Sequence, residues 1–311
     1  MRLKLVPNQT NFRFLKYRFI AAAFSALMIV GSIIAFATLG LNKGIDFEGG
    51  LLLEYSTVED ADLAQFRSVI GSMEMGDTVV QTFGAPNDIL IRIERQPGNV
   101  ELGITDAEAQ QIAIIQVRET LEQEIEGVTF RRSGSVSPKV SGELVNAGIM
   151  AVTFAVLAVL LYIWFRFEWH FGVGAIVALV HDVVLTIGFF AITGLEFNLS
   201  IIAAILTIVG YSLNDTVVVY DRVREKLRKF RSMPLEDLLD LSLNKTLQRT
   251  LMTSLTTLIA LFSLFIFGGE VIAGFTAAMI WGVFIGTYSS VFIAAPVLIF
   301  LDLPRGTYDD Q

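Results

Sequence analysis

The residues best suited to chemistry in this sequence are two polar side chains near the end of an apolar run. The segment from Gly210 to Glu225 reads GYSLNDTVVVYDRVRE, and it brings Asn214 and Asp215 into a stretch that otherwise suits a membrane. A carboxylate at the centre of a bilayer costs roughly 2.5 to 3.5 kcal/mol on insertion scales, so it is rarely found there without a partner or a function. We expect Asp215 to be neutralised or solvated inside a helix bundle.

Arg249 is the candidate partner of Asp215. It precedes the apolar run 250–267, which we expect to run antiparallel to the run that holds Asp215, so the two side chains can lie at similar depth. A nearby cation favours the charged form of an aspartate and desolvation favours the neutral form, so a moving Arg249 would control a proton. Thr253 and Thr256 share its helix face and could order water. Alternatively, Arg249 only anchors the helix, and the two hydroxyls bond back to their own helix.

His181 and Asp182 are further polar residues inside an apolar run. Adjacent residues of a helix point about 100° apart, so we expect these two not to face each other, although either could face the bundle core. We favour a structural bond between helices over a proton relay for this pair. Asn214 is interpreted in the same way, as a group for interhelical hydrogen bonding.

A stripe of small residues runs along the last apolar segment at four-residue spacing. Its members are Gly274, Ala278, Gly282, Gly286, Ser290 and Ala294. Small residues let helix backbones approach closely, and the GVFIG sequence is a GxxxG match. The stripe predicts a helix-packing seam, either within this chain or against a partner.

Composition places the chain among polytopic α-helical membrane proteins. Of its 311 residues, 53% are hydrophobic and only 17% are charged, and the mean hydropathy is +0.61. The sequence has no cysteine, no GxxxxGK[ST] phosphate loop and no HExxH, so we expect no thiol chemistry, nucleotide hydrolysis, metal centre, cofactor or other enzymatic activity. A net charge of -8 gives no sign of a nucleic-acid partner.

Six apolar runs are long enough to cross a lipid bilayer as helices. The first, 19–41, has 23 residues without a charge and completes an N-terminal segment, 1–41, that starts with a basic stretch. We favour an uncleaved helix over a signal peptide, whose apolar region has about 7 to 15 residues. The remaining bundle is predicted over 142–301, with helices at 144–165, 171–194, 197–220, 250–267 and 271–301.

Lys and Arg residues set the expected orientation. Residues 1–18 hold five and the predicted loop 221–249 holds eight, whereas the two short hairpins after the third and fifth helices hold none. By the positive-inside rule the N-terminus, that loop and the tail 302–311 lie in the cytoplasm. The acidic segment 42–141, with 17 acidic and eight basic residues, then lies outside.

Segment 42–141 is predicted to be an α+β domain between the first and second helices. Its runs have the order βαββαβ of the ferredoxin-like unit. They are strands at 51–55, 78–83, 88–94 and 128–133, and helices at 59–73 and 105–125. Thr105 and Glu108 have the spacing of a capping box. We find no catalytic constellation in the domain and interpret it as a contact or lever module.

The domain opens on the sequence GIDFEGG. Gly44, Asp46, Gly49 and Gly50 are interpreted as a junction between the first helix and the domain, because paired glycines can turn a backbone sharply. The alternative is a flexible connection.

Several of these segments resemble the SecF family of bacterial protein-export subunits. The resemblance covers nearly the whole chain and rests on GIDFEGG at 44–50, HDV at 181–183, VGYSLNDTVVVYDRVRE at 209–225, NKTLQRTLMTSLTTL at 244–258, and the stretch from Gly268 to Pro296. It implies a fold of the resistance-nodulation-division type, with SecD as the other half of a twelve-helix assembly in the bacterial inner membrane. It also implies that the complex uses the proton gradient to draw preproteins from the SecYEG channel. Asp215 and Arg249 match the residues assigned to proton passage in that family.

Two other functions stay open. The chain could be half of a proton-driven exporter of small molecules or lipids, although such exporters usually carry both halves on one chain. It could also be a passive membrane scaffold in which the small-residue stripe is the main feature.

Overall fold

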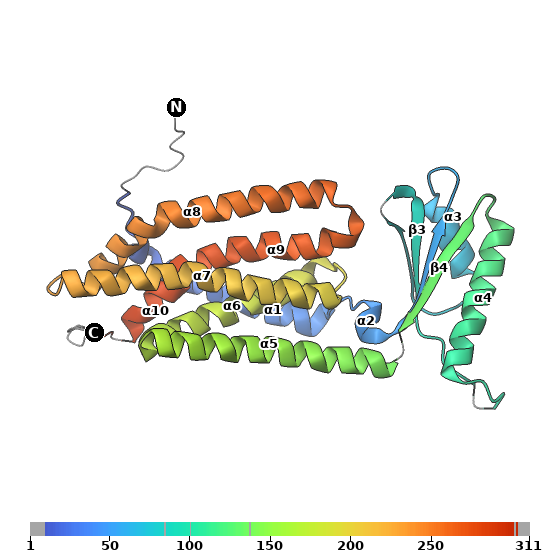
Figure 1. The fold of residues 1–311 in the computed structure, drawn as a ribbon, viewed down its shortest axis with the longest axis horizontal. Coiled ribbons are helices and arrows are strands. Elements are labelled where there is room, and N and C mark those ends of the chain that lie inside the picture. The colour runs from blue at the N-terminus through green and yellow to red at the C-terminus, as the bar shows by residue number, and fades with distance from the viewer. Residues whose placement is uncertain (1–9, 84, 100, 137, 302, 304–311) are drawn as a thin grey trace.

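The structure is a bundle of long helices with a small α+β domain at one end (Figure 1). This computed structural model describes residues 10–83, 85–99, 101–136, 138–301 and 303. Within those ranges, six helices are long and apolar enough to span a membrane, and the domain contains one four-stranded sheet. The predicted fold class is therefore confirmed. Most of the predicted tail, 302–311, lies outside the described residues.

Each predicted apolar run corresponds to a bundle helix, although α1 ends two residues before the predicted end at 41 and α7 begins two residues after the predicted start at 197. The bundle helices are α1 (Arg18–Leu39), preceded by the 3-10 turn η1 (Phe14–Tyr17), α5 (Pro138–Arg166), α6 (Trp169–Thr193), α7 (Leu199–Lys229), α8 (Leu235–Phe267), α9 (Glu270–Ser289), the π-helical turn η2 (Ser290–Ala294) and α10 (Ala295–Phe300). The π turn precedes Pro296, whose missing N–H interrupts the regular hydrogen-bond ladder of the last helix.

The predicted loop 221–249 is wrong, because most of it is helical. α7 continues to Lys229 and α8 already begins at Leu235, so that only residues 230–234 connect them. The reason is an amphipathic pattern that the count of Lys and Arg concealed. Apolar residues recur at helical spacing and are buried, among them Val223, Leu227, Leu235, Leu238, Leu239 and Leu243. The charges occupy the other faces of the same helices.

Small residues set the closest helix contacts. A Cβ atom added to Gly282 of α9 would lie 2.3 Å from Ile208 Cγ1 of α7, and one added to Gly286 would lie 3.0 Å from Ser212 Cβ. The stripe thus packs against α7 within this chain. A second close approach joins α6 to α1, where a Cβ on Gly188 would lie 2.1 Å from Ser32 Oγ. Such approaches are typical of membrane helices, whose association depends on van der Waals packing.

The α+β domain has the predicted βαββαβ order. Its elements are β1 (Gly50–Ser56), α3 (Leu63–Gly71), β2 (Thr78–Phe83), β3 (Ala85–Ile93), α4 (Asp106–Glu124) and β4 (Thr129–Val136), and the short helix α2 (Ile45–Glu48) precedes them. The antiparallel sheet has the order β2-β3-β1-β4, which is the ferredoxin-like arrangement. Alternate residues of the strands, such as Leu53 and Ile91, form a core with the helices.

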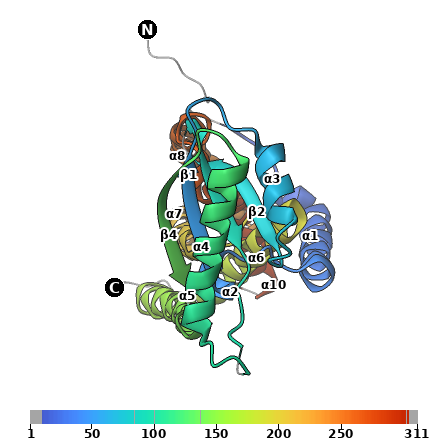
Figure 2. The ribbon, with the colours of Figure 1, turned by 90° about the vertical axis from the view of Figure 1, so that its right-hand side faces the viewer.

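The domain helices lie on the face of the sheet that points away from the bundle (Figure 2). α4 begins with the predicted capping box of Thr105 and Glu108. The predicted helix 59–73 is shorter than expected, because Asp62 accepts hydrogen bonds from the amides of Ala64 and Gln65 and so caps α3 at Leu63. The opposite face of the sheet is turned toward the bundle end and leaves a cavity of about 380 Å³ between them.

Candidate functional site

A polar layer crosses the middle of the bundle and separates two apolar cores. One core includes Phe171 and Tyr220, and the other, nearer the domain, includes Phe190 and Ile208. The buried polar side chains between them come from α6 (His181, Asp182), α7 (Ser212, Asp215, Thr216), α8 (Thr250, Ser254) and α9 with η2 (Ser289, Ser290). Buried polar groups at this depth are costly, so the layer is the candidate functional site.

Asp215 lies inside the polar layer with one carboxylate oxygen unpaired. Its side chain is 2% exposed, and its Oδ2 atom has no hydrogen-bond partner among the described residues. Arg249 is near enough for its charge to act on this carboxylate. In the described part of the chain, however, the two side chains form no ion pair within 4.0 Å, and Arg249 is exposed on the bundle surface. The two groups are neighbours without direct contact, and their role in proton passage stays a prediction.

The hydroxyl groups of α8 differ from the predicted stripe. Thr253 donates to the carbonyl of Arg249 at 2.9 Å and Thr256 donates to that of Met252 at 2.9 Å, which is the alternative of bonding back to the same helix. The buried face instead carries Thr250 and Ser254. This face is one residue, or about 100°, out of step with the face of Arg249 and Thr253, because leucines farther down the helix determine which side packs against the bundle.

Ser254 connects α8 with two other helices. Its Oγ atom lies 2.7 Å from Thr287 Oγ1 of α9, and Tyr211 of α7 donates its hydroxyl to the same atom at 3.3 Å. Thr250 Oγ1 is buried without a hydrogen-bond partner in the described chain. The contact between α7, α8 and α9 thus contains three hydrogen-bonded hydroxyl groups, and Thr250 on the same face of α8 adds a hydroxyl without a partner in the described chain.

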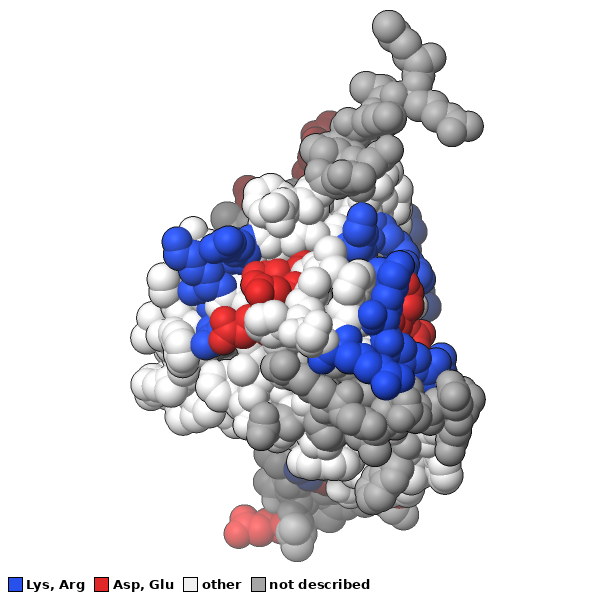
Figure 3. All heavy atoms as spheres, turned by 90° about the vertical axis from the view of Figure 1, so that its left-hand side faces the viewer, with Lys and Arg blue, Asp and Glu red and all other residues white. Residues whose placement is uncertain are grey.

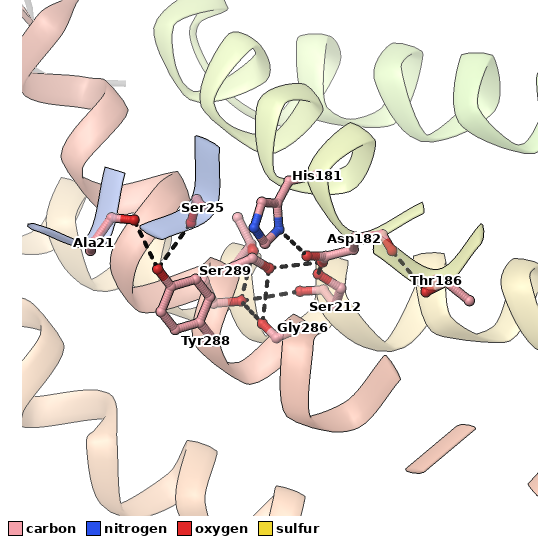
Figure 4. A network of polar contacts seen from close by, with 11 residues as sticks. Ala21, Ser25, His181, Asp182, Thr186, Ser212, Gly286, Tyr288 and Ser289 are labelled. Carbon is pink, nitrogen blue, oxygen red and sulfur yellow. Dashed lines mark hydrogen bonds and ion pairs between the residues drawn. The ribbon is translucent and has the colours of Figure 1, made fainter. Parts of the chain in front are cut away.

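Asp182 holds three helices together (Figure 4). Its Oδ2 atom accepts hydrogen bonds from Ser212 Oγ of α7 at 2.6 Å and from Ser289 Oγ of α9 at 2.8 Å. The interhelical bond favoured from the sequence is therefore present. Its Oδ1 atom lies 2.9 Å from His181 Nδ1, so the expectation that these neighbours do not face each other is wrong. Rotation about the side-chain torsions brings the polar atoms together although the two Cα–Cβ bonds diverge.

Two other predicted groups lie apart from this network. Asn214 is exposed on the surface of α7 rather than bonded across the bundle interior. Gly274, at the domain end of the small-residue stripe, does not mark a close helix approach. A Cβ atom added there would lie at an ordinary contact distance of 3.7 Å from Ile201 Cδ1.

Several members of the layer were missed in the sequence. Thr246, Thr250 and Ser254 recur every four residues on α8, and TYSS at 287–290 interrupts an apolar helix. Both patterns could have been found by asking which hydroxyl residues share a face with the buried leucines. Ser290 was noticed only for its size, yet it hydrogen-bonds to Thr216 at 2.9 Å.

The predicted junction is bonded to the hairpin between α6 and α7. Asp46 Oδ2 accepts a hydrogen bond from the amide of Leu199 at 2.9 Å, the first residue of α7, where an anion is favoured by the free N–H groups. The amide of Phe197 donates a hydrogen bond to the carbonyl of Asn42 at 2.7 Å, and the carbonyl of Phe197 accepts one from the amide of Gly44 at 2.8 Å. The interpretation as a flexible connection is therefore not supported.

Three glycines are required by the geometry of this junction. Gly50 has φ +130°, and a Cβ there would lie 2.6 Å from the carbonyl oxygen of Ile93. Gly49 has φ 76°, in the region that glycine adopts most readily. At Gly44 a Cβ would lie 2.5 Å from Glu196 Oε1. The chain can turn from the bundle into β1 only because these side chains are absent.

Arg92 joins the sheet itself to the bundle end. It lies on β3, donates to the carbonyl of Lys43 at 3.1 Å and pairs with Glu196 of the α6–α7 hairpin at 3.6 Å. The α+β domain is thus attached at two points to the start of α7, the helix that carries Asp215.

Comparison with known proteins agrees with this architecture. Residues 116–303 match the family described as protein export membrane protein SecD/SecF, C-terminal, and residues 34–61 match the SecD/SecF GG motif. The protein translocase subunit SecF of Cereibacter sphaeroides is 45% identical over 98% of this chain and 94% of its own length. SecF of Rickettsia akari is 42% identical over 95% of this chain and 94% of its own length.

Solved structures show the same fold. The crystal structure of SecDF from Thermus thermophilus matches with a TM-score of 0.81 and 31% identity, covering 98% of this chain. A SecDF crystal structure in a super-membrane-facing form matches with a TM-score of 0.70 and 33% identity over 96% of this chain. The chain spans 40% of each of those SecDF chains. On the matched family, the near full-length relatives and the shared fold, the chain belongs to the SecD/SecF family of protein export membrane proteins, as a SecF-type subunit.

Proposed function

We propose that this chain works with a SecD partner to couple the proton gradient to late steps of preprotein movement out of the SecYEG channel and across the inner membrane. The observation that carries the proposal is the buried carboxylate of Asp215, whose Oδ2 atom has no hydrogen-bond partner among the described residues, on a helix that is bonded directly to the α+β domain. Family membership supports the transport context, and the geometry of α7 supports the coupling.

Asp215 has the surroundings that a transmembrane proton site requires. An ionised carboxylate with a free oxygen in the bundle interior is costly, so proton uptake relieves that cost. Arg249 acts in the opposite sense, because its charge favours the ionised form. A change in the distance between α7 and α8 therefore changes whether Asp215 holds its proton. Thr250, also buried in the polar layer, has a hydroxyl without a partner among the described residues that could bind water.

α7 provides the mechanical link. Asp215 lies 16 residues after Leu199, or about 24 Å along the helix axis. At that first residue the helix is held by Asp46, and the adjoining hairpin is held by Arg92 through Glu196. A shift of α7 at the polar layer would therefore be transmitted to the domain as a displacement of its attachment points.

Charge supports the proposed orientation. Figure 3 shows Lys and Arg side chains gathered at the bundle end opposite the domain. Four of them, Arg166, Arg224, Arg228 and Lys229, line one hollow there. With this end in the cytoplasm, the N-terminus of the chain is cytoplasmic and the α+β domain lies in the periplasm.

Exposed faces of the bundle support a membrane-embedded partner. One exposed face is apolar and suits lipid, because α5 buries little of its surface within this chain and Phe154, Leu161 and Phe165 on it are exposed. Asn214 and Arg249 are exposed within the spans of α7 and α8. Polar groups seldom face lipid, so we assign their side of the bundle to SecD and the remaining apolar surface to lipid.

The test replaces Asp215 with Asn in the full chain, assembled with SecD and SecYEG in membrane vesicles. We expect gradient-dependent export to be lost, while export driven by ATP alone continues. Asp221→Asn is the matched control, because Asp221 lies six residues farther along α7 and pairs with Arg166 at 3.2 Å on the exposed surface. Equal export by Asp215→Asn and Asp221→Asn, at equal protein levels, would exclude the proposed role of Asp215.

A further inference from the structure

His181 belongs to the polar layer through only one of its two ring nitrogens. Its Nδ1 atom contacts Asp182, whereas its Nε2 atom is buried and has no hydrogen-bond partner among the residues that the structure describes. The whole side chain is 2% exposed. Figure 4 shows the second nitrogen on the side of the ring turned toward α1, where Ser25 lies.

The surroundings of Asp182 determine which nitrogen carries hydrogen. Ser212 and Ser289 both donate to its Oδ2 atom, and donors around a carboxylate favour its ionised form. An ionised carboxylate only accepts hydrogen bonds, so His181 Nδ1 must be the donor at the 2.9 Å contact. The Nε2 atom of the neutral ring is then left with a free lone pair.

The side chain of His181 borders a cavity at the edge of the bundle. His181 lines a space of about 430 Å³ between α1, α6 and the η2–α10 segment. Three of the lining residues have polar side chains, and two of these are already engaged: Ser25 bonds to Tyr288 at 2.9 Å, and Arg18 pairs with Glu236 at 2.5 Å. His181 Nε2 is therefore a buried hydrogen-bond acceptor at the wall of this cavity, without a partner among the described residues. The cavity has room for water, which takes about 30 Å³ per molecule, although its lining is mostly apolar.

We propose that His181 is a second proton-accepting group of the bundle, separate from Asp215, with Asp182 as its fixed counter-charge. In the step, the Nε2 lone pair forms a new N–H bond with a proton delivered by a hydronium ion in the cavity, one O–H bond of that ion breaks, and neutral water is left. The Nδ1–H bond stays intact. The pair of His181 and Asp182 thereby changes from a net charge of −1 to a neutral ion pair, and removing net charge lowers the cost of burial.

The charged and titratable groups around His181 fit this role. On its own helix it meets Asp182, and its ring stacks on Tyr288 of α9 with centroids 6.0 Å apart. Arg18 of α1 lines the same cavity as His181, and its charge is paired with that of Glu236 of α8. From α7, Ser212 bonds to Asp182 and lies three residues before Asp215, on the same face of the helix. Proton uptake at His181 changes the field at Asp182, and Ser212 connects that change to the helix of the first proton site.

The direct test is histidine nitrogen NMR on the full chain in lipid bilayers. The sequence has only two histidines, so His170→Gln leaves His181 as the single reporter. We expect Nδ1 to stay protonated throughout, while Nε2 gains a proton as the pH is lowered over the range in which the full chain stays folded. Asp182→Asn should abolish this behaviour. A ring protonated at Nε2 at every pH, or one unchanged over the whole range, would overturn the proposal.

A second measurement asks whether the site contributes to transport, and this arm rests on the proposed function. We expect His181→Gln to lower gradient-dependent export several-fold at normal protein levels, with His170→Gln as the matched control. His170 is also buried in α6 but stacks on Trp169 with centroids 3.8 Å apart instead of meeting a carboxylate. Equal export by the two variants would refute a transport role for His181. An unaffected Asp215→Asn variant would instead refute the proposed function and leave the NMR result standing.

Discussion

Replacing Gly282 with Ala should separate α7 from α9 and weaken the whole polar layer. The new Cβ would lie 2.3 Å from Ile208 Cγ1, 2.5 Å from its Cδ1 and 2.9 Å from its Cγ2. Carbon atoms in contact prefer about 3.5 to 4.0 Å, so roughly 1.2 Å is missing. A rotation of Ile208 gives little relief, because both of its γ carbons are close and a β-branched side chain in a helix has one strongly preferred rotamer.

The expected cost follows from this geometry. Overpacking of a well-packed interior costs about 1 to 3 kcal/mol. If α9 moved away by the missing distance, the Thr216–Ser290 hydrogen bond, now 2.9 Å, would lengthen to about 4 Å and be lost. We therefore expect Gly282→Ala to lower the unfolding temperature of the full chain by several degrees and to reduce export.

The absence of cysteine offers a clean assay. Ala204 is fully buried in α7, so Ala204→Cys introduces a single thiol that reacts with a dye only when the bundle opens. Gly274→Ala is the matched control, since its Cβ would lie at an ordinary 3.7 Å from Ile201. In an Ile208→Ala background the effect of Gly282→Ala should shrink. Identical thiol-exposure temperatures for Gly282→Ala and Gly274→Ala would refute the reasoning.

Two further predictions concern the α+β domain. Gly50→Ala should disrupt the start of β1, because the φ of +130° and the 2.6 Å approach to the carbonyl oxygen of Ile93 leave no room for a Cβ. Gly134→Ala, in open space on β4, should be tolerated and is the control. The measurement is the protease resistance of the domain in the full chain, and equal resistance of the two variants would contradict the prediction. The second concerns acid. The Thr105 amide lowers the pKa of Glu108, and the Gly98 amide, followed by Arg95, lowers the pKa of Asp106. Their contribution to the stability of α4 is therefore present above the ordinary carboxyl pKa of about 4 and is lost as the pH falls through the lowered values. Hydrogen-exchange protection in the first turn of α4 should fall over that range, and less so in Glu108→Gln; an equal fall in both would contradict this role of Glu108.

Turn and cap signals made the domain the most predictable part of the chain. Its βαββαβ order follows from local alternation of apolar residues, and the Thr105–Glu108 capping box was visible in the spacing. α3 was overextended because Asp62 stops it through hydrogen bonds to backbone amides, which spacing alone does not reveal.

The sequence by itself determined the membrane class, the six spans, the junction and the position of the one carboxylate at mid-depth in α7, since all of these depend on local hydrophobicity and on residue type. Only the tertiary structure decided which faces meet. It turned Thr250 and Ser254 inward in place of Thr253 and Thr256, and it left Asn214 exposed. The reason is physical: the rotation of a helix about its axis is fixed by packing against its neighbours. A shift of a single residue, about 100°, moves a side chain from the surface to the core.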